Sequence, residues 1–433
     1  MDYKQKIITV GDAIKKVKTG SKIVAASFAS QPKSFLSFLH TLPKNITNLS
    51  IYNVYLLDYP FLQENRFTVY STFYSGALRV AEKARGNVRY IPAHVSQFPA
   101  IYAGVNPDIF VGAASMPKDG KVSLSLANLY DRQSLEAAKT VILEINPNFP
   151  YTKGSVEVDL AKVNYIIEAD YKPLTIEESA LSEKDIIIGN LIAAEIKDGD
   201  CLQFGIGAIP DAVANALVKK KHLGIHTEML TNGALKLILS GAVDNSKKKI
   251  GKGKSTTVFA CGSQALYDYM HNNDKVEMLD ADYVNSPSII AQNDNQVSIN
   301  STIEVDFFGQ CASETLGTKH FSGSGGQFDT VQGAKWSKGG RSYIALHSTA
   351  KVKNADGSVT EVSKIVPELK SGAAITLPRN EVDIVVTEYG IARLRGVDVV
   401  ERAKRLIAIA HPDFRNELIE AMKKRWGSAK NIP

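Results

Sequence analysis

One glutamate, Glu228, occupies a sequence position at which an α/β fold can place chemistry. It follows residues 223–226 (LGIH), which are typical of a short strand, so we expect Glu228 at or just past the carboxyl end of that strand. In parallel α/β sheets, ligands bind at this edge. A carboxylate placed there could take part in catalysis, although a glutamate at a strand end is usually a solvated surface group.

Two glycine-rich segments could bind a nucleotide or an anion. Residues 205–209 (GIGAI) follow a predicted strand, and Pro210 is expected to open a helix behind them, where backbone N–H groups lack partners. Because Pro210 replaces the third glycine of the dinucleotide fingerprint, a tight βα turn is the alternative interpretation. In residues 322–326 (SGSGG), the adjacent Gly325 and Gly326 could form an oxyanion hole or a mobile surface loop.

Other polar groups could support these segments. Asn285 offers a carboxamide donor in a turn set by Pro287, although most such segments are only turns. No arginine lies between Arg132 and Arg341, so a phosphate bound by that stretch must meet lysine ammonium or backbone N–H groups.

The elements that must position these groups form a diverged internal repeat. Four segments of the first half have counterparts in the same order in the second half, and Val54 aligns with Glu228. The pairs are 22–26 with 201–204, 48–55 with 222–229, 139–147 with 341–349, and 162–170 with 381–389.

Short β-branched runs alternate with helical patterns, which predicts an α/β fold of two similar tandem domains with mainly parallel sheets. A length of 433 residues also favours two domains. The polar stretch 173–185 is the expected boundary, giving an N-terminal domain of residues 1–180 and a C-terminal domain of residues 181–433.

Composition excludes several classes of protein. No apolar run is long enough for a signal peptide or a membrane span, and the three cysteines lack metal-ligand spacing, which favours a reduced, cytoplasmic protein that binds no metal. The net charge of +6 includes the lysine runs 219–221 and 247–249. Aromatic residues do not interleave these runs, so we expect solvated surfaces rather than a nucleic-acid interface.

Taken together, the motifs resemble the acetyl-CoA hydrolase/transferase type of class I CoA-transferases. The resemblance runs over nearly the whole chain and is densest from Cys201 to Arg415. The matching segments are FGIGAIPDAV (204–213), LGIHTEMLTNG (223–233), DYVNSP (282–287), INSTIEVDFFGQ (299–310), SGSGGQFD (322–329), RNEVDIVVTEYGIARLRG (379–396) and IAHPDFR (409–415).

The resemblance implies a role for each candidate residue. Glu228 corresponds to the nucleophile, and the side chain of Asn285 and the N–H of Gly326, beside Gly325, correspond to the oxyanion donors. Lys351 corresponds to a coenzyme-binding lysine. The loop that contacts coenzyme A corresponds to Gly205, Ile206, Gly207, Ala208 and Ile209.

The implied activity moves coenzyme A between a short-chain acyl-CoA and a free carboxylate, with an acyl group that is acetyl, propionyl, butyryl or 4-hydroxybutyryl. Coenzyme A is then a substrate, with no tightly bound cofactor, and the resemblance implies a homodimer. It also implies that residues 181–433 carry the catalytic Glu228 and most of the coenzyme site, with the acyl pocket between the two domains. One alternative is an acyl-CoA hydrolase that uses the same Glu228. Another is a catalytically silent protein that binds CoA or a related metabolite.

Overall fold

A computed structural model of the chain describes residues 3–178, 180–354 and 356–427. The chain forms two compact units, and each unit gathers segments that are separated in the sequence. The first unit contains the residues up to Glu177 together with His226–Asn232 and Gly253–Ser286. The second contains Glu178–Ile225, Gly233–Lys252 and the residues from Pro287 onward.

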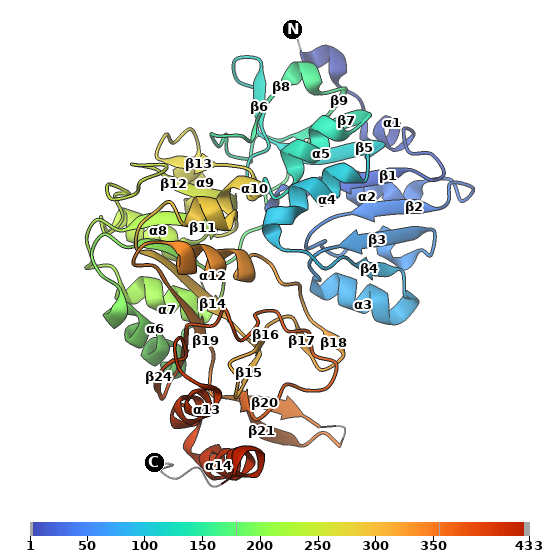
Figure 1. Ribbon diagram of the computed structural model, residues 1–433. Helices are drawn as coiled ribbons and strands as arrows, with labels where there is room; N and C mark the ends of the chain where they lie inside the picture. The colour runs from blue at the N-terminus through green and yellow to red at the C-terminus, as the bar shows by residue number, and fades with distance from the viewer. Residues whose placement is uncertain (1–2, 179, 355, 428–433) are drawn as a thin grey trace. The chain divides into compact units, whose positions relative to one another are not determined.

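The first unit is built on a seven-stranded parallel sheet with the order β4-β3-β2-β1-β5-β7-β9 (Figure 1). Its strands are β1 Lys22–Ala25, β2 Leu49–Tyr52, β3 Phe67–Ser71, β4 Val88–Tyr90, β5 Ile109–Ala114, β7 Thr140–Ile145 and β9 Tyr165–Glu168. All six residues of β5 are buried, as expected for the centre of a parallel sheet with helices on its faces.

Within the described residues the first unit has seven short α-helices. A hydrophobic core gathers side chains from β1, β2, β3 and the helices beside them, including Phe35, Ile51 and Phe67. The helices are α1 Val10–Ile14, α2 Lys33–Phe38, α3 Gly76–Arg85, α4 Phe98–Gly104, α5 Asp131–Ala137, α9 Gln264–Met270 and α10 Ala281–Val284. An antiparallel pair of β6 Lys121–Ser123 and β8 Glu157–Asp159 completes this unit.

A second sheet has the order β13-β12-β11-β10-β14-β19-β23-β24, and only β24 runs antiparallel to its neighbour. Strand β11 pairs with β10 through Gly224 and Ile225 and with β12 from His226 onward. The strands are β10 Cys201–Phe204, β11 Gly224–Leu230, β12 Ser255–Ala260, β13 Val276–Met278, β14 Gln296–Ser301, β19 Arg341–Ala345, β23 Ile384–Thr387 and β24 Gly390–Arg393.

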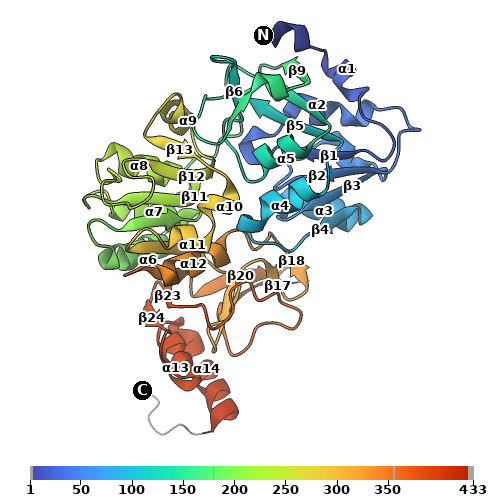
Figure 2. The same cartoon turned by 45° about the horizontal axis from the view of Figure 1, so that its top comes forward.

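The helices around the second half of this sheet include α6 and α7, which lie side by side (Figure 1, Figure 2). The set is α6 Glu183–Glu195, α7 Ala208–Ala216, α8 Asn232–Leu239, α11 Pro287–Ile290, α12 Gln327–Trp336, α13 Val399–Ala408 and α14 Pro412–Trp426. Short strands form three further sheets: β15 Glu304–Asp306 with β16 Cys311–Ala312 and β22 Ile365–Val366, β17 Thr315–Leu316 with β18 Lys319–His320, and β20 Thr349–Lys353 with β21 Val359–Ser363.

The strand orders confirm the fold class of two similar α/β halves. Strands β4-β3-β2-β1-β5-β7-β9 correspond one for one to β13-β12-β11-β10-β14-β19-β23. The register agrees as well, because Lys22 pairs with Ser50 and Cys201 pairs with Gly224. All four segment pairs found in the sequence therefore lie on equivalent strands.

The cysteines are reduced, as the sequence predicted. The cysteines Cys201, Cys261 and Cys311 are buried free thiols. No helix within the described residues is long and apolar enough to cross a membrane.

Candidate active site

Glu228 lies inside β11, two residues before its last residue, rather than at or past the strand end as the sequence predicted. The predicted strand was too short because the polar Thr227 and Glu228 interrupt the apolar pattern, while pairing with β12 continues the strand to Leu230. Glu228 is partly exposed between buried neighbours. Its backbone carbonyl accepts a hydrogen bond from Thr257 Oγ1 at 3.1 Å, which fixes the strand at this point.

The carboxylate of Glu228 meets the carboxamide of Asn285, a contact that the sequence did not predict. Asn285 Nδ2 donates to Glu228 Oε2 over 2.8 Å, and the Asn285 side chain is almost fully buried. The remaining carboxamide oxygen, Asn285 Oδ1, has no hydrogen-bond partner among the described residues. The carboxamide is therefore oriented so that its donor faces the carboxylate.

Asn285 is the C-cap of α10, a helix of four residues that cannot hold its own conformation and is fixed at both ends. At its start, Asp280 accepts from Arg132 Nε at 3.0 Å and from Arg132 Nη2 at 2.5 Å, in a paired geometry that fixes direction as well as distance. At its end, His226 Nε2 contacts the carbonyl oxygen of Val284 at 2.8 Å. These contacts position the carboxamide that holds Glu228.

The loop of residues 205–209 joins β10 to α7 in the second unit. Helix α7 begins at Ala208, two residues before Pro210, so the proline occupies the first turn rather than opening the helix. Gly207 has φ +113°, a conformation that side chains disfavour, and Ile206 is 58% exposed. An apolar side chain held out on a glycine turn at a helix N-terminus suits contact with a ligand.

The glycine pair 325–326 precedes α12, with Gly326 as its N-cap and Gly325 at φ +55°. Gly326 is buried, and its N–H has no acceptor among the described residues. Helix α12 lies against α11 (Figure 2), and a Cβ added at Gly333 would come within 2.5 Å of Ile290 Cβ, so the helix has little freedom to shift. The geometry thus presents a fixed backbone donor.

Strand β14 brings these two glycine segments of the second unit to the same sheet edge. Gly205 N donates to Ile299 O at 3.1 Å, and Gln327 Nε2 donates to Ser301 O at 3.0 Å. A buried hydrogen bond of 3.0 Å between Ser298 Oγ and Thr330 Oγ1 further ties α12 to β14. The N-termini of α7 and α12 therefore both lie where parallel sheets bind anionic or polar ligands.

Lys351 lies apart from these segments, on strand β20 of an exposed hairpin. It stands opposite Glu361 in the register of the hairpin. It does not line the pocket formed by the 205–209 loop, which contains a different lysine, Lys364.

His226 and Asp280, which position Asn285, were not among the residues predicted from the sequence. His226 precedes Glu228 by two residues and so shares its strand face, which is a signal that the sequence did carry. Asp280 shows no signal, because its importance comes from a partner, Arg132, that only the fold brings to it.

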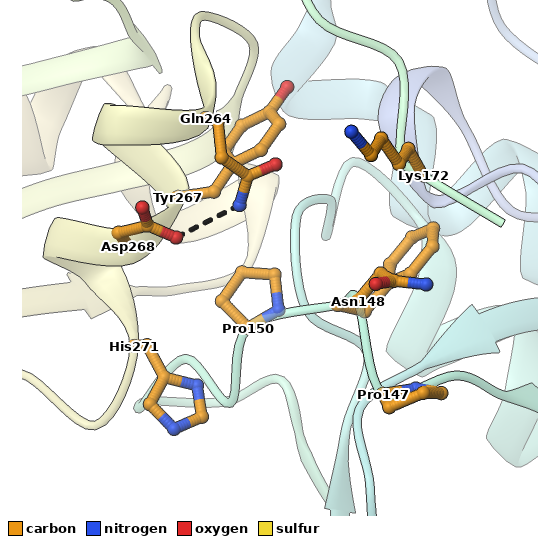
Figure 3. Close-up of a pocket in the computed structure, with 9 residues that line it drawn as sticks. Pro147, Asn148, Pro150, Lys172, Gln264, Tyr267, Asp268 and His271 are labelled. Atoms are coloured by element: carbon orange, nitrogen blue, oxygen red, sulfur yellow. Dashed lines mark hydrogen bonds between the residues drawn. The ribbon is translucent and has the colours of Figure 1, made fainter. Parts of the chain in front are cut away.

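A pocket of about 290 Å³ in the first unit contains none of the predicted site residues (Figure 3). Its polar side chains bond to the protein itself: Gln264 Nε2 donates to Asp268 Oδ1 at 2.9 Å, and Tyr267 OH donates to Leu174 O. His271 Nδ1 accepts from the Tyr151 N–H. Because these groups do not converge on a common point, the pocket is a poor candidate for catalysis.

The described residues contain no group of three or more His, Cys, Asp and Glu side chains arranged to hold a metal ion. In the first unit, Glu228 and Asn285 bring together a carboxylate and a carboxamide donor, which can attack a carbonyl carbon and stabilise an oxyanion. In the second unit, the two glycine segments present backbone N–H groups at helix N-termini.

Comparison with known proteins places the chain in a family. Residues 1–178 match the acetyl-CoA hydrolase/transferase N-terminal domain, and residues 262–422 match the C-terminal domain. The 4-hydroxybutyrate coenzyme A transferase of Clostridium kluyveri is 39% identical and covers 98% of this chain and 99% of its own. The butyryl-CoA:acetate CoA-transferase of Anaerostipes caccae is 32% identical, with 98% and 97% covered.

A solved structure has the same fold over nearly the whole chain. RipA from Yersinia pestis matches with a TM-score of 0.92 and 35% identity, covering 98% of each chain. An acetyl-CoA hydrolase of Schizosaccharomyces pombe is more distant, at 25% identity over 77% of this chain. The similarity thus favours the proteins named as transferases over those named as hydrolases.

Proposed function

The chain belongs to the acetyl-CoA hydrolase/transferase family, and from this premise we propose that it transfers coenzyme A between short-chain carboxylic acids through a covalent intermediate on Glu228. The observation that carries the proposal is the 2.8 Å hydrogen bond from the buried Asn285 Nδ2 to Glu228 Oε2. This contact orients a carboxylate and supplies a donor to it without neutralising it, as a carboxylate nucleophile requires.

The reaction begins when one oxygen of Glu228 attacks the thioester carbonyl carbon of an acyl-CoA. The carbon–sulfur bond breaks, which releases CoA thiolate and leaves a mixed anhydride between the acyl group and Glu228. The thiolate then attacks the glutamyl carbonyl carbon, and the acyl carboxylate departs. A glutamyl-CoA thioester remains, so the energy of the thioester is conserved.

An incoming carboxylate runs these steps in reverse and leaves as the new acyl-CoA. Asn285 contributes when the glutamyl carbon is attacked, because its Nδ2 already lies at hydrogen-bond distance from an oxygen that becomes an oxyanion. The Gly326 N–H is the second donor of the proposal, supported by its place at the start of α12.

The loop of residues 205–209 and Gly325 bind coenzyme A in this proposal, and Lys351 contacts a phosphate. Support for the loop comes from its glycine turn, its exposed Ile206 and its place at a helix N-terminus. We further propose a cytoplasmic homodimer in which residues 1–180 and 181–433 act as the two functional domains.

The trapping experiment uses butyryl-CoA and no acceptor acid. Glu228 is expected to accumulate a thioester to CoA, which borohydride reduces to an alcohol, inactivating the enzyme. Free enzyme treated with borohydride should keep its activity. Glu228→Ala should be inert, and Glu228→Gln nearly so, because an amide does not open a thioester at a useful rate. Peptide mapping locates the adduct.

A CoA adduct on another carboxylate, or transfer without any adduct, contradicts the role of Glu228. Supplying acetate and measuring acetyl-CoA separates transfer from hydrolysis, since water as acceptor yields free CoA and no new thioester. Initial rates at varied butyryl-CoA and acetate should give parallel double-reciprocal lines, because the first acid leaves before the second binds.

A further inference from the structure

A pocket of about 250 Å³ lies beside the 205–209 loop in the second unit and contains a lysine, Lys364, to which the site described above gives no role. Its walls are mostly apolar or hydroxyl-bearing, with Asp185 and His347 as the other ionisable side chains. The lining residues are Asp185, Ile206, Gly207, Ala208, Ile209, Pro210, Ser301, Thr302, Ala345, Leu346, His347 and Lys364.

The backbone of Lys364 is held firmly while its ammonium group is left without an acceptor. Lys364 N donates to Ser348 O at 2.9 Å, and β22 begins at the next residue. No described residue accepts a hydrogen bond from Lys364 Nζ. Burial lowers the pKa of this lysine to about 8, although the carboxylates of Glu388 and Glu304 oppose the shift. A desolvated ammonium group with unused donors favours a ligand that supplies oxygen acceptors.

The charges around Lys364 argue against a phosphate as that ligand. Lys184 pairs with Glu388 at 3.0 Å, and Glu304 adds a second carboxylate near Lys364. Asp185, within the pocket, accepts from His347 Nε2 at 2.7 Å. The ammonium groups of Lys184 and Lys364 therefore lie among three carboxylates, those of Glu388, Glu304 and Asp185. This excess of negative charge disfavours a diphosphate. A neutral oxygen can still accept a hydrogen bond from Lys364.

We propose that Lys364 binds an amide carbonyl of the pantetheine arm of acyl-CoA, whose uncharged chain suits the mixture of apolar and hydroxyl-bearing walls. The inference rests on the proposed function, because it takes the 205–209 loop as the coenzyme loop. It distinguishes Lys364, which binds the arm, from Lys351, proposed to contact a phosphate.

Steady-state kinetics with two donors test the assignment. Butyryl-CoA carries the phosphates, whereas S-butyrylpantetheine has the same arm and thioester without them. Lys364→Met should raise KM roughly tenfold for both donors, with kcat within about twofold of the wild type, because ground-state contacts of this kind change KM. Lys351→Met should raise KM for butyryl-CoA alone. The exposed Lys353→Met, on the same hairpin, is the matched control and should change neither constant.

The pH dependence of the wild type provides a test that needs no variant. Protonated Lys364 donates most strongly, so KM for S-butyrylpantetheine should rise as pH increases through about 8. This donor has neither a phosphate nor a free thiol that titrates in that range. The groups facing Lys364 are Glu388 and Glu304, with the Asp185–His347 pair in the same pocket.

Two results overturn the assignment: an unchanged KM for both donors in Lys364→Met, or an increase confined to butyryl-CoA, which would make Lys364 a phosphate ligand. If Lys364→Met does not fold, a wild-type KM for S-butyrylpantetheine that does not change with pH overturns the assignment instead. Calorimetric binding of CoA separates this inference from the proposed function, because weaker binding by Lys364→Met supports the contact even if Glu228 forms no adduct.

Discussion

At the scale of single residues, the sequence identified Asn285 and Glu228 as candidate catalytic residues but could not show that their side chains contact each other. Both were candidates, one as a donor and one as a nucleophile, yet 57 positions separate them. The structure places Asn285 Nδ2 at 2.8 Å from Glu228 Oε2 and buries the carboxamide. Residue type indicated the chemistry, whereas only the fold could supply the distance.

Replacing Asn285 with alanine should lower kcat on the order of a hundredfold, because one oxyanion donor is typically worth about 3 kcal/mol in the transition state. KM for acyl-CoA should change little, since the donor acts on the reacting carbon rather than on the coenzyme. Initial rates with butyryl-CoA and acetate give both constants. Asn45→Ala, at an exposed position, is the control, and a fully active Asn285→Ala variant would show that the donor has been wrongly placed.

At the scale of elements, the sequence predicted the strands and helices around the site well, and their ends less well. Strand β11 extends beyond the predicted residues because pairing with β12 outweighs the polar Glu228. Helix α7 starts before Pro210 because a proline without its N–H is tolerated anywhere in the first turn. Helix α10 was read only as a turn, since four residues carry no periodic pattern.

The contact between Arg132 and Asp280 at the start of α10 should matter for catalysis. Asp280→Asn removes the charge that two Arg132 donors bind, which loosens the start of the helix and displaces Asn285. Small displacements of a catalytic group cost much of its effect, so kcat should fall at least about tenfold with KM for acyl-CoA nearly unchanged. The measurements are kcat and KM of the variant together with its thermal unfolding temperature.

The matched control for Asp280→Asn is Asp274→Asn, which removes an exposed ion pair with Lys153 in the same unit. Exposed pairs contribute little, so its kcat should equal that of the wild type. If Asp280→Asn unfolds at a lower temperature but keeps its kcat, the Arg132 contact stabilises the unit without positioning Asn285.

At the scale of the whole molecule, the internal repeat was predictable because strand spacing survives divergence of side chains. Equivalent register in the two sheets places Val54 where the second half has Glu228. Val54 is 1% exposed, and its N–H donates to Tyr130 OH at 3.1 Å. The first half thus keeps the architecture of the site and fills its catalytic position with a buried apolar side chain. The composition of the two units could not be predicted, because it depends on which segments pack together.

The duplication predicts a single covalent adduct for each chain. Two similar halves could in principle give two reactive sites, but a valine has no nucleophilic atom, and Glu228 has no counterpart at the equivalent position of the first sheet. Intact mass measurement after prolonged incubation with butyryl-CoA should therefore show a chain with one CoA attached, and Glu228→Ala should show none. A doubly modified chain would reveal a second nucleophile, which peptide mapping would locate, and would contradict the prediction.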